Sequence, residues 1–283
     1  MKILVALDSK EYSKNILKDV ARLARNTLAD ILFLGVQDGK VQSPEKALVD
    51  TLLKYQENIY SFFSSEELPY APFASSEFTS ERKGLWSISS KGMKEFTIKI
   101  ATDSIAKQAV AIAKESECNL IILGCSSRHG CEWSGEMNAP LRIAKDAPCS
   151  VLVVKKAGNP DQIISIMDKS FISQDSLEMV NQVLTLHDAG LKIVGLKEKK
   201  GSTLGDDMEK RMVHLLKYYN DLEINAWLKL IDAGDIEDYV IQSSREAIVA
   251  LWMGKQSLIK KLFSHSMVDK LLETTRSSLL ILR

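Results

Sequence analysis

CNLIILGCSSRHGCEWSGEMNAPLRIAKDAPCSVLVV, residues 118–154, contains two short apolar runs, Leu120–Leu123 and Val151–Val154. A polar loop and a short helix of about Ala139–Lys145 separate them. Continuous apolar runs of this length are typical of parallel strands buried on both faces. The loop therefore follows the carboxyl end of a strand and leads into a helix N-terminus. Open α/β sheets bind ligands at such strand ends, and free N–H groups at a helix N-terminus attract phosphate.

The same pattern extends over the rest of the chain and repeats. Lys2–Leu7 predicts a buried strand that ends at Asp8, and Gln162–Met167 predicts one that ends at Asp168. Each half has the order βαβαβαβαβ, which favours a duplicated α/β unit. We predict two tandem doubly wound domains, residues 1–156 and 160–283, each a five-stranded parallel sheet with helices on both faces.

The two halves differ in length. Asp8 and Gly124 are 124 − 8 = 116 positions apart, whereas Asp168 and Gly254 are 254 − 168 = 86 apart. The difference of 30 is close to the length of Ser64–Gly92, where the helix and strand patterns stop. This segment contains four aromatic residues, Tyr70, Phe73, Phe78 and Trp86. Plain linkers seldom contain that many, so we predict an insertion at about 64–92 in the first domain.

Composition excludes several classes of protein. The 283 residues contain 37 Lys and Arg and 37 Asp and Glu, a formal net charge of zero that favours neither nucleic acid nor an anionic membrane as partner. Asp8 comes too early for the apolar core of a signal peptide, and no apolar run approaches the roughly 18 residues of a membrane span. All four cysteines lie within residues 118–149, so a cytoplasmic location is expected rather than a secreted disulfide framework.

The runs LIILG (Leu120–Gly124) and APCSVLVV (Ala147–Val154), with a loop and helix between them, resemble the C-terminal half of a universal stress protein domain. Nucleotide-binding members of that family have the motif Gly-x2-Gly-x9-Gly-[Ser/Thr] at this place. In this chain the motif spacing falls on Gly124, Ser127, Met137 and Asn138.

The resemblance implies the strand order 3-2-1-4-5 in each domain. It also implies pairing of the two domains through their last strands, Val151–Val154 and Ser278–Leu282, and a homodimer with a second copy. In nucleotide-binding relatives the acid that matches Asp8 lies near the adenosine, and the backbone at the position of Val36 meets adenine.

Each of these residues also has an ordinary structural interpretation. Asp8 can cap the turn or helix that follows it, and Val36 can be a plain strand-end residue. Ser13 is expected to cap the first helix.

The phosphate loop departs from the motif. Glycines let a backbone take positive φ and let phosphate reach the N–H groups. Ser127 keeps a hydroxyl donor, whereas Met137 places a side chain where the anion should meet backbone. Asn138 adopts the left-handed conformation readily and can donate from its amide. Arg128 is a candidate phosphate ligand, with a solvated surface residue as the alternative.

Two further motifs are weaker. The second half keeps Gly254 and Ser266, and the lysines between them fit the solvated face of an amphipathic segment. Cys125, His129 and Cys131 suggest zinc, but five residues separate the cysteines, whereas structural sites use two to four. Redox-active thiols and small buried cysteines are the alternatives.

We therefore expect a cytoplasmic tandem universal stress protein, a stress-response module that binds ATP or AMP in its first domain, with Mg²⁺ as an optional companion of ATP. Any ATP hydrolysis should be slow, because no general base or metal-binding acid is evident beyond Asp8. The main alternative is a nucleotide-free interaction protein that recognises a partner through residues 64–92. An enzyme of the adenine-nucleotide α-hydrolase type is the third.

Overall fold

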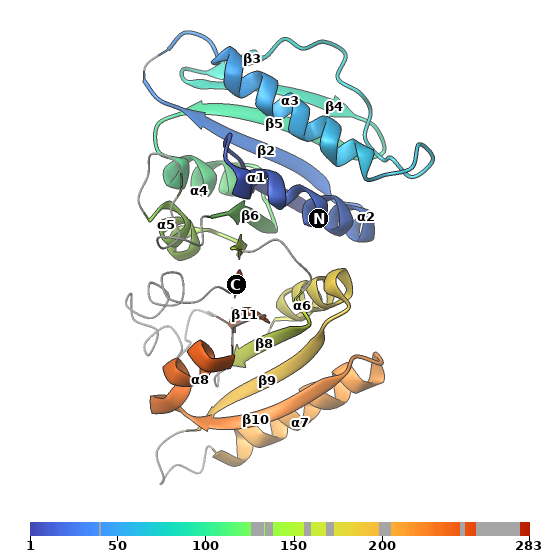
Figure 1. The fold of residues 1–283 in the computed structure, drawn as a ribbon, viewed down its shortest axis with the longest axis vertical. Coiled ribbons are helices and arrows are strands. Elements are labelled where there is room, and N and C mark those ends of the chain that lie inside the picture. Colours follow the sequence, from blue (N-terminus) through green and yellow to red (C-terminus); the bar gives the residue numbers. More distant parts are fainter. Residues whose placement is uncertain are drawn as a thin grey trace. The chain divides into compact units, whose positions relative to one another are not determined.

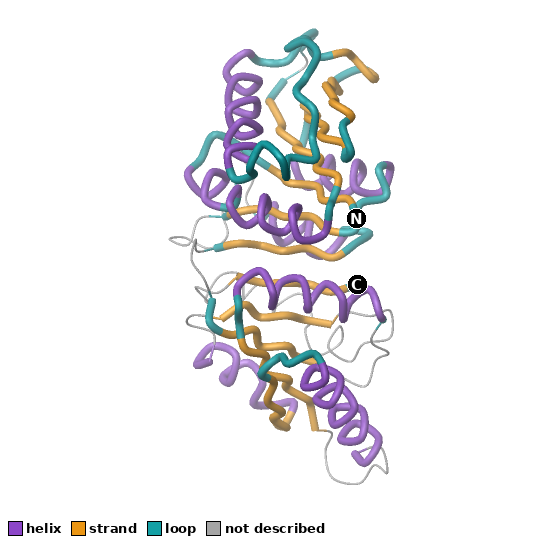
Figure 2. Tube along the Cα trace, turned by 90° about the vertical axis from the view of Figure 1, so that its right-hand side faces the viewer, coloured by secondary structure: helices purple, strands orange, loops and turns teal. Residues whose placement is uncertain are grey.

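The computed structural model describes residues 1–39, 41–125, 133, 138–155, 160–167, 173–197, 205–243, 247–252 and 278–283. It divides into two compact units, Met1–Ala157 and Gly158–Arg283. In each unit, helices lie on both sides of a largely parallel sheet (Figures 1 and 2). The predicted α/β doubly wound fold class is confirmed.

The elements of the first unit follow in chain order. They are β1 (Lys2–Ala6), α1 (Glu11–Asn15), α2 (Leu17–Thr27), β2 (Asp30–Gln37), α3 (Lys46–Ser61), β3 (Thr79–Arg82), β4 (Leu85–Lys91), β5 (Glu95–Thr102), α4 (Ile105–Glu115), β6 (Leu120–Gly124), α5 (Ala139–Asp146) and β7 (Ser150–Val154). Strand pairing gives the order β7-β6-β1-β2-β5-β4-β3.

The sheet of the first unit is larger than the predicted five parallel strands. The strands β7, β6, β1, β2 and β5 are parallel, but β4 runs antiparallel to β5 and β3 antiparallel to β4. The predicted insertion supplies both additional strands, because β3 and β4 lie entirely within residues 64–92. The segment is therefore a hairpin that extends the sheet.

The aromatic residues of this insertion belong largely to the core. Tyr70 is 3% exposed, and its hydroxyl donates to the carbonyl oxygen of Ala29 at 2.7 Å. Its ring lies 5.5 Å from Phe96 and 6.0 Å from Tyr60, centroid to centroid. Trp86 of β4 is 5% exposed. An insertion that serves mainly as an exposed recognition loop would leave such side chains in water, so this structure weakens the sequence-based alternative.

The second unit repeats the plan without the hairpin. Its elements are β8 (Gln162–Met167), α6 (Gln174–His187), β9 (Gly190–Lys197), α7 (Gly205–Asp221), β10 (Ala226–Asp232), a 3₁₀ turn (Ala233–Asp235), α8 (Ile236–Ser243), β11 (Ala247–Trp252) and β12 (Ser278–Leu282). The described strands are all parallel, in the order β10-β9-β8-β11-β12.

Burial explains why the central strands form. Every residue of β6, β7, β11 and β12 is buried, as expected for strands covered on both faces. The helices α2 and α3 pack against each other, as do α4 and α5. Ser104 caps α4 through its hydroxyl, which accepts from the N–H of Lys107. No helix among the described residues is long and apolar enough to cross a bilayer.

Candidate functional site

The carboxyl ends of β2, β1 and β6 lie side by side in the first unit. Ala6 of β1 is opposite Leu34 of β2 on one side and Leu123 of β6 on the other. The chain leaves β1 toward β2 and later returns on the other side through β6, so the order of strands reverses between β1 and β6. Ligands bind outside the carboxyl ends at such a switch point. Three predicted site residues, Asp8, Val36 and Gly124, lie at these ends.

The carboxylate of Asp8 is held by its own loop. Its Oδ1 accepts from the N–H of Lys10 at 2.9 Å and from the hydroxyl of Ser13 at 2.7 Å. Its Oδ2 accepts a short hydrogen bond from the phenol of Tyr12. The Ser13 hydroxyl in turn accepts from the N–H of Asp8 at 3.0 Å. Asp8 therefore organises the turn into α1, which is the structural role considered for it.

Ser13 does not act as predicted. It lies inside α1 rather than before a helix, and α2 begins at Leu17 without a side-chain cap. The hydroxyl is fully buried because it closes the Asp8 turn. The sequence interpretation placed the serine correctly near a helix start but missed that the carboxylate was its partner.

The glycine at the end of β6 is required by close packing. A Cβ at Gly124 would overlap the carbonyl oxygen of Tyr12 and lie 2.9 Å from the Tyr12 carbonyl carbon. The ring of Tyr12 also packs 5.7 Å from that of Trp133, which is 1% exposed. Tyr12 thus packs against this region with three of its parts: its hydroxyl contacts Asp8, its ring contacts Trp133 and its backbone contacts Gly124.

Asn138 has the backbone conformation that the sequence suggested. It precedes α5 with φ 59° and ψ 19°, in the left-handed region that Gly and Asn tolerate best. Its side chain is exposed and makes no capping hydrogen bond to the helix. The carboxamide is therefore available at the helix N-terminus. Ser127, Arg128 and Met137 lie outside the described residues, as do His129 and Cys131.

Val36 is half-buried near the end of β2 and faces Ala101 of β5 in the ladder.

The next residue, Gln37, was missed by sequence reasoning. Its Nε2 donates to the carbonyl oxygen of Ser43 at 3.2 Å, and its Oε1 accepts from the N–H of Glu45 at 2.7 Å. Gln37 is 5% exposed, so it fixes the loop that carries the chain from β2 into α3. The signal in the sequence was a polar residue at the end of an apolar strand.

Tyr55 of α3 belongs to the same electrostatic neighbourhood. Burial raises the pKa of its phenol, and the negative charges of Asp8 and Glu11 raise that pKa further. The phenol therefore stays protonated at neutral pH.

The described residues offer little to a metal ion. They contain no cluster of three or more His, Cys, Asp or Glu side chains placed to hold one. Cys125 is 1% exposed and disulfide-bonded, so it is no thiolate for zinc. Burial raises the pKa of the Cys118 thiol to about 11, in agreement with a small buried residue. The reducing compartment expected from the sequence stays a prediction.

The second unit has a different residue at the position of Gly124. In β11, Leu251 is opposite Ile166, two residues before Asp168, just as Leu123 is opposite Ala6, two residues before Asp8. The next residue is Trp252, so the sequence alignment that put Gly254 at the position of Gly124 is off by two. Trp252 is 4% exposed, and its indole N–H donates to the Ser165 hydroxyl. Asp168 and Gly254 lie outside the described residues.

Comparison with known proteins supports this description. The sequence profile of the universal stress protein family matches residues 1–155. No curated protein sequence matches the chain. A protein of unknown function from Pseudomonas aeruginosa PAO1 is 15% identical, with a TM-score of 0.60 over 99% of this chain and 92% of its own. A universal stress protein from Archaeoglobus fulgidus DSM 4304 is 12% identical, with a TM-score of 0.57 over 100% and 96%.

Proposed function

The chain belongs to the universal stress protein family, and from this we propose that its first unit binds an adenine nucleotide, ATP or AMP, at the carboxyl ends of β1, β2 and β6. The second unit then acts as a structural partner in a stress-response module. A homodimer and a cytoplasmic location are parts of the same proposal.

The observation that carries the proposal is Asn138 in the left-handed conformation at the start of α5. This conformation turns the chain into the helix in the place that the third glycine region of the motif occupies. The exposed carboxamide of Asn138 lies at the N-terminus of α5, where the free N–H groups of a helix favour an anion, although Pro140 contributes none.

Asp8 would meet the nucleoside. A carboxylate has about four lone-pair positions, and Lys10, Tyr12 and Ser13 occupy three of them. The remaining one suits a ribose hydroxyl or the adenine amine. Trp252 in the second unit argues for one site in each chain, because an indole replaces the glycine there.

Resident Mg²⁺ fits this site poorly. Magnesium prefers several oxygen ligands in an octahedral arrangement, and the described residues include no cluster of three or more His, Cys, Asp or Glu side chains that could supply them. Any Mg²⁺ would arrive with the ATP phosphates. With no general base beside Asp8 in the described part of the site, we expect hydrolysis to be slow.

Isothermal titration with AMP, ATP, adenosine and inorganic phosphate tests the proposal. We expect saturable binding of AMP or ATP at or below about 1 mM. The Asp8→Ala variant should weaken adenosine and AMP together, whereas Asn138→Gly keeps the backbone conformation, removes the amide and should weaken AMP more than adenosine. The control is Asp221→Asn, which removes an exposed carboxylate at the end of α7. If neither AMP nor ATP at millimolar concentration gives a measurable heat of binding, the proposal is wrong.

A further inference from the structure

The sheet of the second unit ends at an open edge. β10 (Ala226–Asp232) is its outermost strand, and among the described residues β9 is the one strand that pairs with it (Figure 1). Its seven residues keep an uninterrupted register with β9 and include no proline. The sheet of the first unit ends instead in the short hairpin strand β3. A long and regular edge strand is able to pair with a strand of another chain.

The backbone of β10 determines which of its residues can receive that strand. The N–H of Leu191 in β9 donates to the carbonyl oxygen of Asn225 at 2.9 Å. Successive residues of a strand direct their N–H and C=O groups alternately to its two sides. Every second residue from Asn225 therefore faces β9. The residues between them, Ala226, Leu228 and Leu230, direct their N–H and C=O groups to the open edge.

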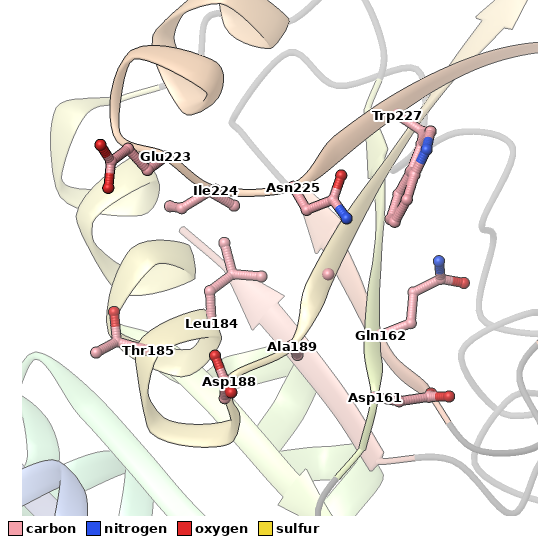
Figure 3. A pocket seen from close by; sticks show the side chains of 11 residues that line it. Asp161, Gln162, Leu184, Thr185, Asp188, Ala189, Glu223, Ile224, Asn225 and Trp227 are labelled. Carbon is pink, nitrogen blue, oxygen red and sulfur yellow. The ribbon is translucent and has the colours of Figure 1, made fainter.

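Two side chains at this edge are suited to an interface. Trp227 is 47% exposed and lies among the residues that line a surface pocket (Figure 3). Part of its indole covers Gly190, where a Cβ would lie 2.9 Å from the Trp227 Cζ3 atom. Two residues along, on the same face of the strand, the Lys229 ammonium lies 4.4 Å from the ring centroid of Tyr239. Tryptophan is enriched among the residues that dominate binding at protein interfaces.

One antiparallel register with a second copy of the chain matches these groups. When Leu228 lies opposite Leu228 of the second copy, Ala226 lies opposite Leu230. These pairs exchange about six N–H···O bonds through the groups at the open edge. Trp227 then lies opposite Lys229 of the second copy in a non-hydrogen-bonded pair, in which Cα atoms approach to about 4.5 Å. The ammonium of Lys229 thereby meets an indole, the aromatic ring that attracts cations most strongly.

The neighbouring registers fit less well. A register centred on Lys229 places two ammonium groups directly opposite each other, which destabilises a pair of strands. A register centred on Trp227 pairs only Ala226–Leu228 of each β10 strand. The β10 sequence is therefore complementary to itself in the register centred on Leu228.

We propose that two copies of the chain dimerise by antiparallel pairing of their β10 strands. The two-fold axis passes beside Leu228 and relates the two Trp227–Lys229 contacts. The inference specifies the surface of the homodimer proposed above, and it is independent of nucleotide binding in the first unit. A strand pair of this length is small beside the roughly 1,200 Å² of a stable interface. We therefore expect a reversible dimer with a dissociation constant of about 10–100 µM.

Sedimentation velocity of the full chain over a series of concentrations tests the dimer. The variants Trp227→Ala and Lys229→Glu should each raise the dissociation constant by at least about tenfold. The matched control is Lys217→Glu, which makes the same change of charge at an exposed position of α7 and should dimerise as the wild type does. Both edge side chains are exposed, so the variants should fold, and thermal melts followed by circular dichroism check this.

Cysteine crosslinking tests the register. In the Leu228→Cys variant the two Cα atoms of the central pair lie about 5.5 Å apart, a separation that a disulfide spans. Diamide, which takes up the two thiol hydrogens, should therefore give a covalent dimer that dithiothreitol cleaves. Wild-type protein and Val213→Cys, at a position of α7 that is 55% exposed, should give only background linking.

Two results would overturn the proposal. One is a chain that stays monomeric throughout the concentration series. The other is a dimer that neither edge variant weakens and that Leu228→Cys does not link, which would place the homodimer on another surface. Neither result bears on nucleotide binding, which the calorimetric titrations measure separately.

Discussion

Replacement of Tyr70 tests whether the hairpin insertion is an integral part of the first unit. Tyr70 is 3% exposed, stacks on Tyr60, meets Phe63 and Phe96 edge-on, and donates its hydroxyl to Ala29. Truncation to Ala removes a buried ring and leaves a cavity among its aromatic neighbours. Large-to-small changes of aromatic core residues cost about 3–5 kcal/mol.

The conservative change separates the ring from its hydroxyl. Tyr70→Phe keeps the three ring contacts and removes one donor, so the carbonyl oxygen of buried Ala29 loses this partner. A buried acceptor left without its donor costs about 1–3 kcal/mol. We therefore expect a graded series in which Tyr70→Phe lowers stability by about half as much as Tyr70→Ala does.

Differential scanning calorimetry of the full chain is the suitable assay, because two units need not unfold as one transition. For a unit of this size, 1 kcal/mol corresponds to about 2–4 °C in Tm. The matched control is Phe62→Ala, an aromatic truncation at the end of α3 whose side chain is 38% exposed. A Tyr70→Ala shift no larger than that of Phe62→Ala would refute the argument and would restore the insertion as a surface appendage.

Three further changes test the strand-end region and its surroundings. Asp8→Ala removes the acceptor of three hydrogen bonds and should lower stability by about 2–3 kcal/mol in urea denaturation; no loss would contradict its role in the turn. Gly124→Ala drives a Cβ into the Tyr12 backbone and should cost about 1–3 kcal/mol, whereas Gly234→Ala, with no atom within 4 Å of the added Cβ, should be near neutral in the same assay. Burial raises the pKa of Asp19 from 3.8 to about 6, so the folded chain binds a proton between these pH values that the unfolded chain releases. Stability from this group therefore rises as pH falls through that window, and Asp19→Asn should flatten that part of the stability profile; an unchanged profile would exclude this cause.

Local patterns were sufficient for the parts of the fold that depend on burial. The central strands appear in the sequence as apolar runs because both faces of each strand are covered, and β6 and β7 lie close to the ranges predicted. Asn138 was recognised because few residues tolerate positive φ, which is a property of one residue and not of its neighbours.

The hairpin was missed for the opposite reason. All four residues of β3 are exposed, so no alternation of apolar and polar residues marks the strand. In β4 the buried positions are Leu85, Trp86, Ile88 and Ser90, so two adjacent residues and a serine break the alternation of apolar and polar residues. The turn with Gly84 at φ 75° was the available signal.

The site was predicted in outline but not in its contacts. That Asp8 ends a strand follows from the sequence, whereas its engagement by Tyr12 and Ser13 depends on the path of the turn between them. The residue that replaces Gly124 in the second unit was misplaced by two positions, because glycine identity is a weaker guide than the pairing of Leu251 with Ile166. Register is a property of the assembled sheet.

The short outer strand β3 also hinders a second copy of the chain from pairing with this edge of the sheet. It has four residues, an irregular pairing between Ser80 and Arg82, and an ion pair from Glu81 to Lys99, all features that discourage another chain from joining a sheet edge. Without the hairpin, β5 would present eight residues as an open edge, and four of them, Phe96, Ile98, Ile100 and Ala101, are buried apolar residues. Loss of this segment would therefore favour aggregation of the chain, whatever it did to ligand binding.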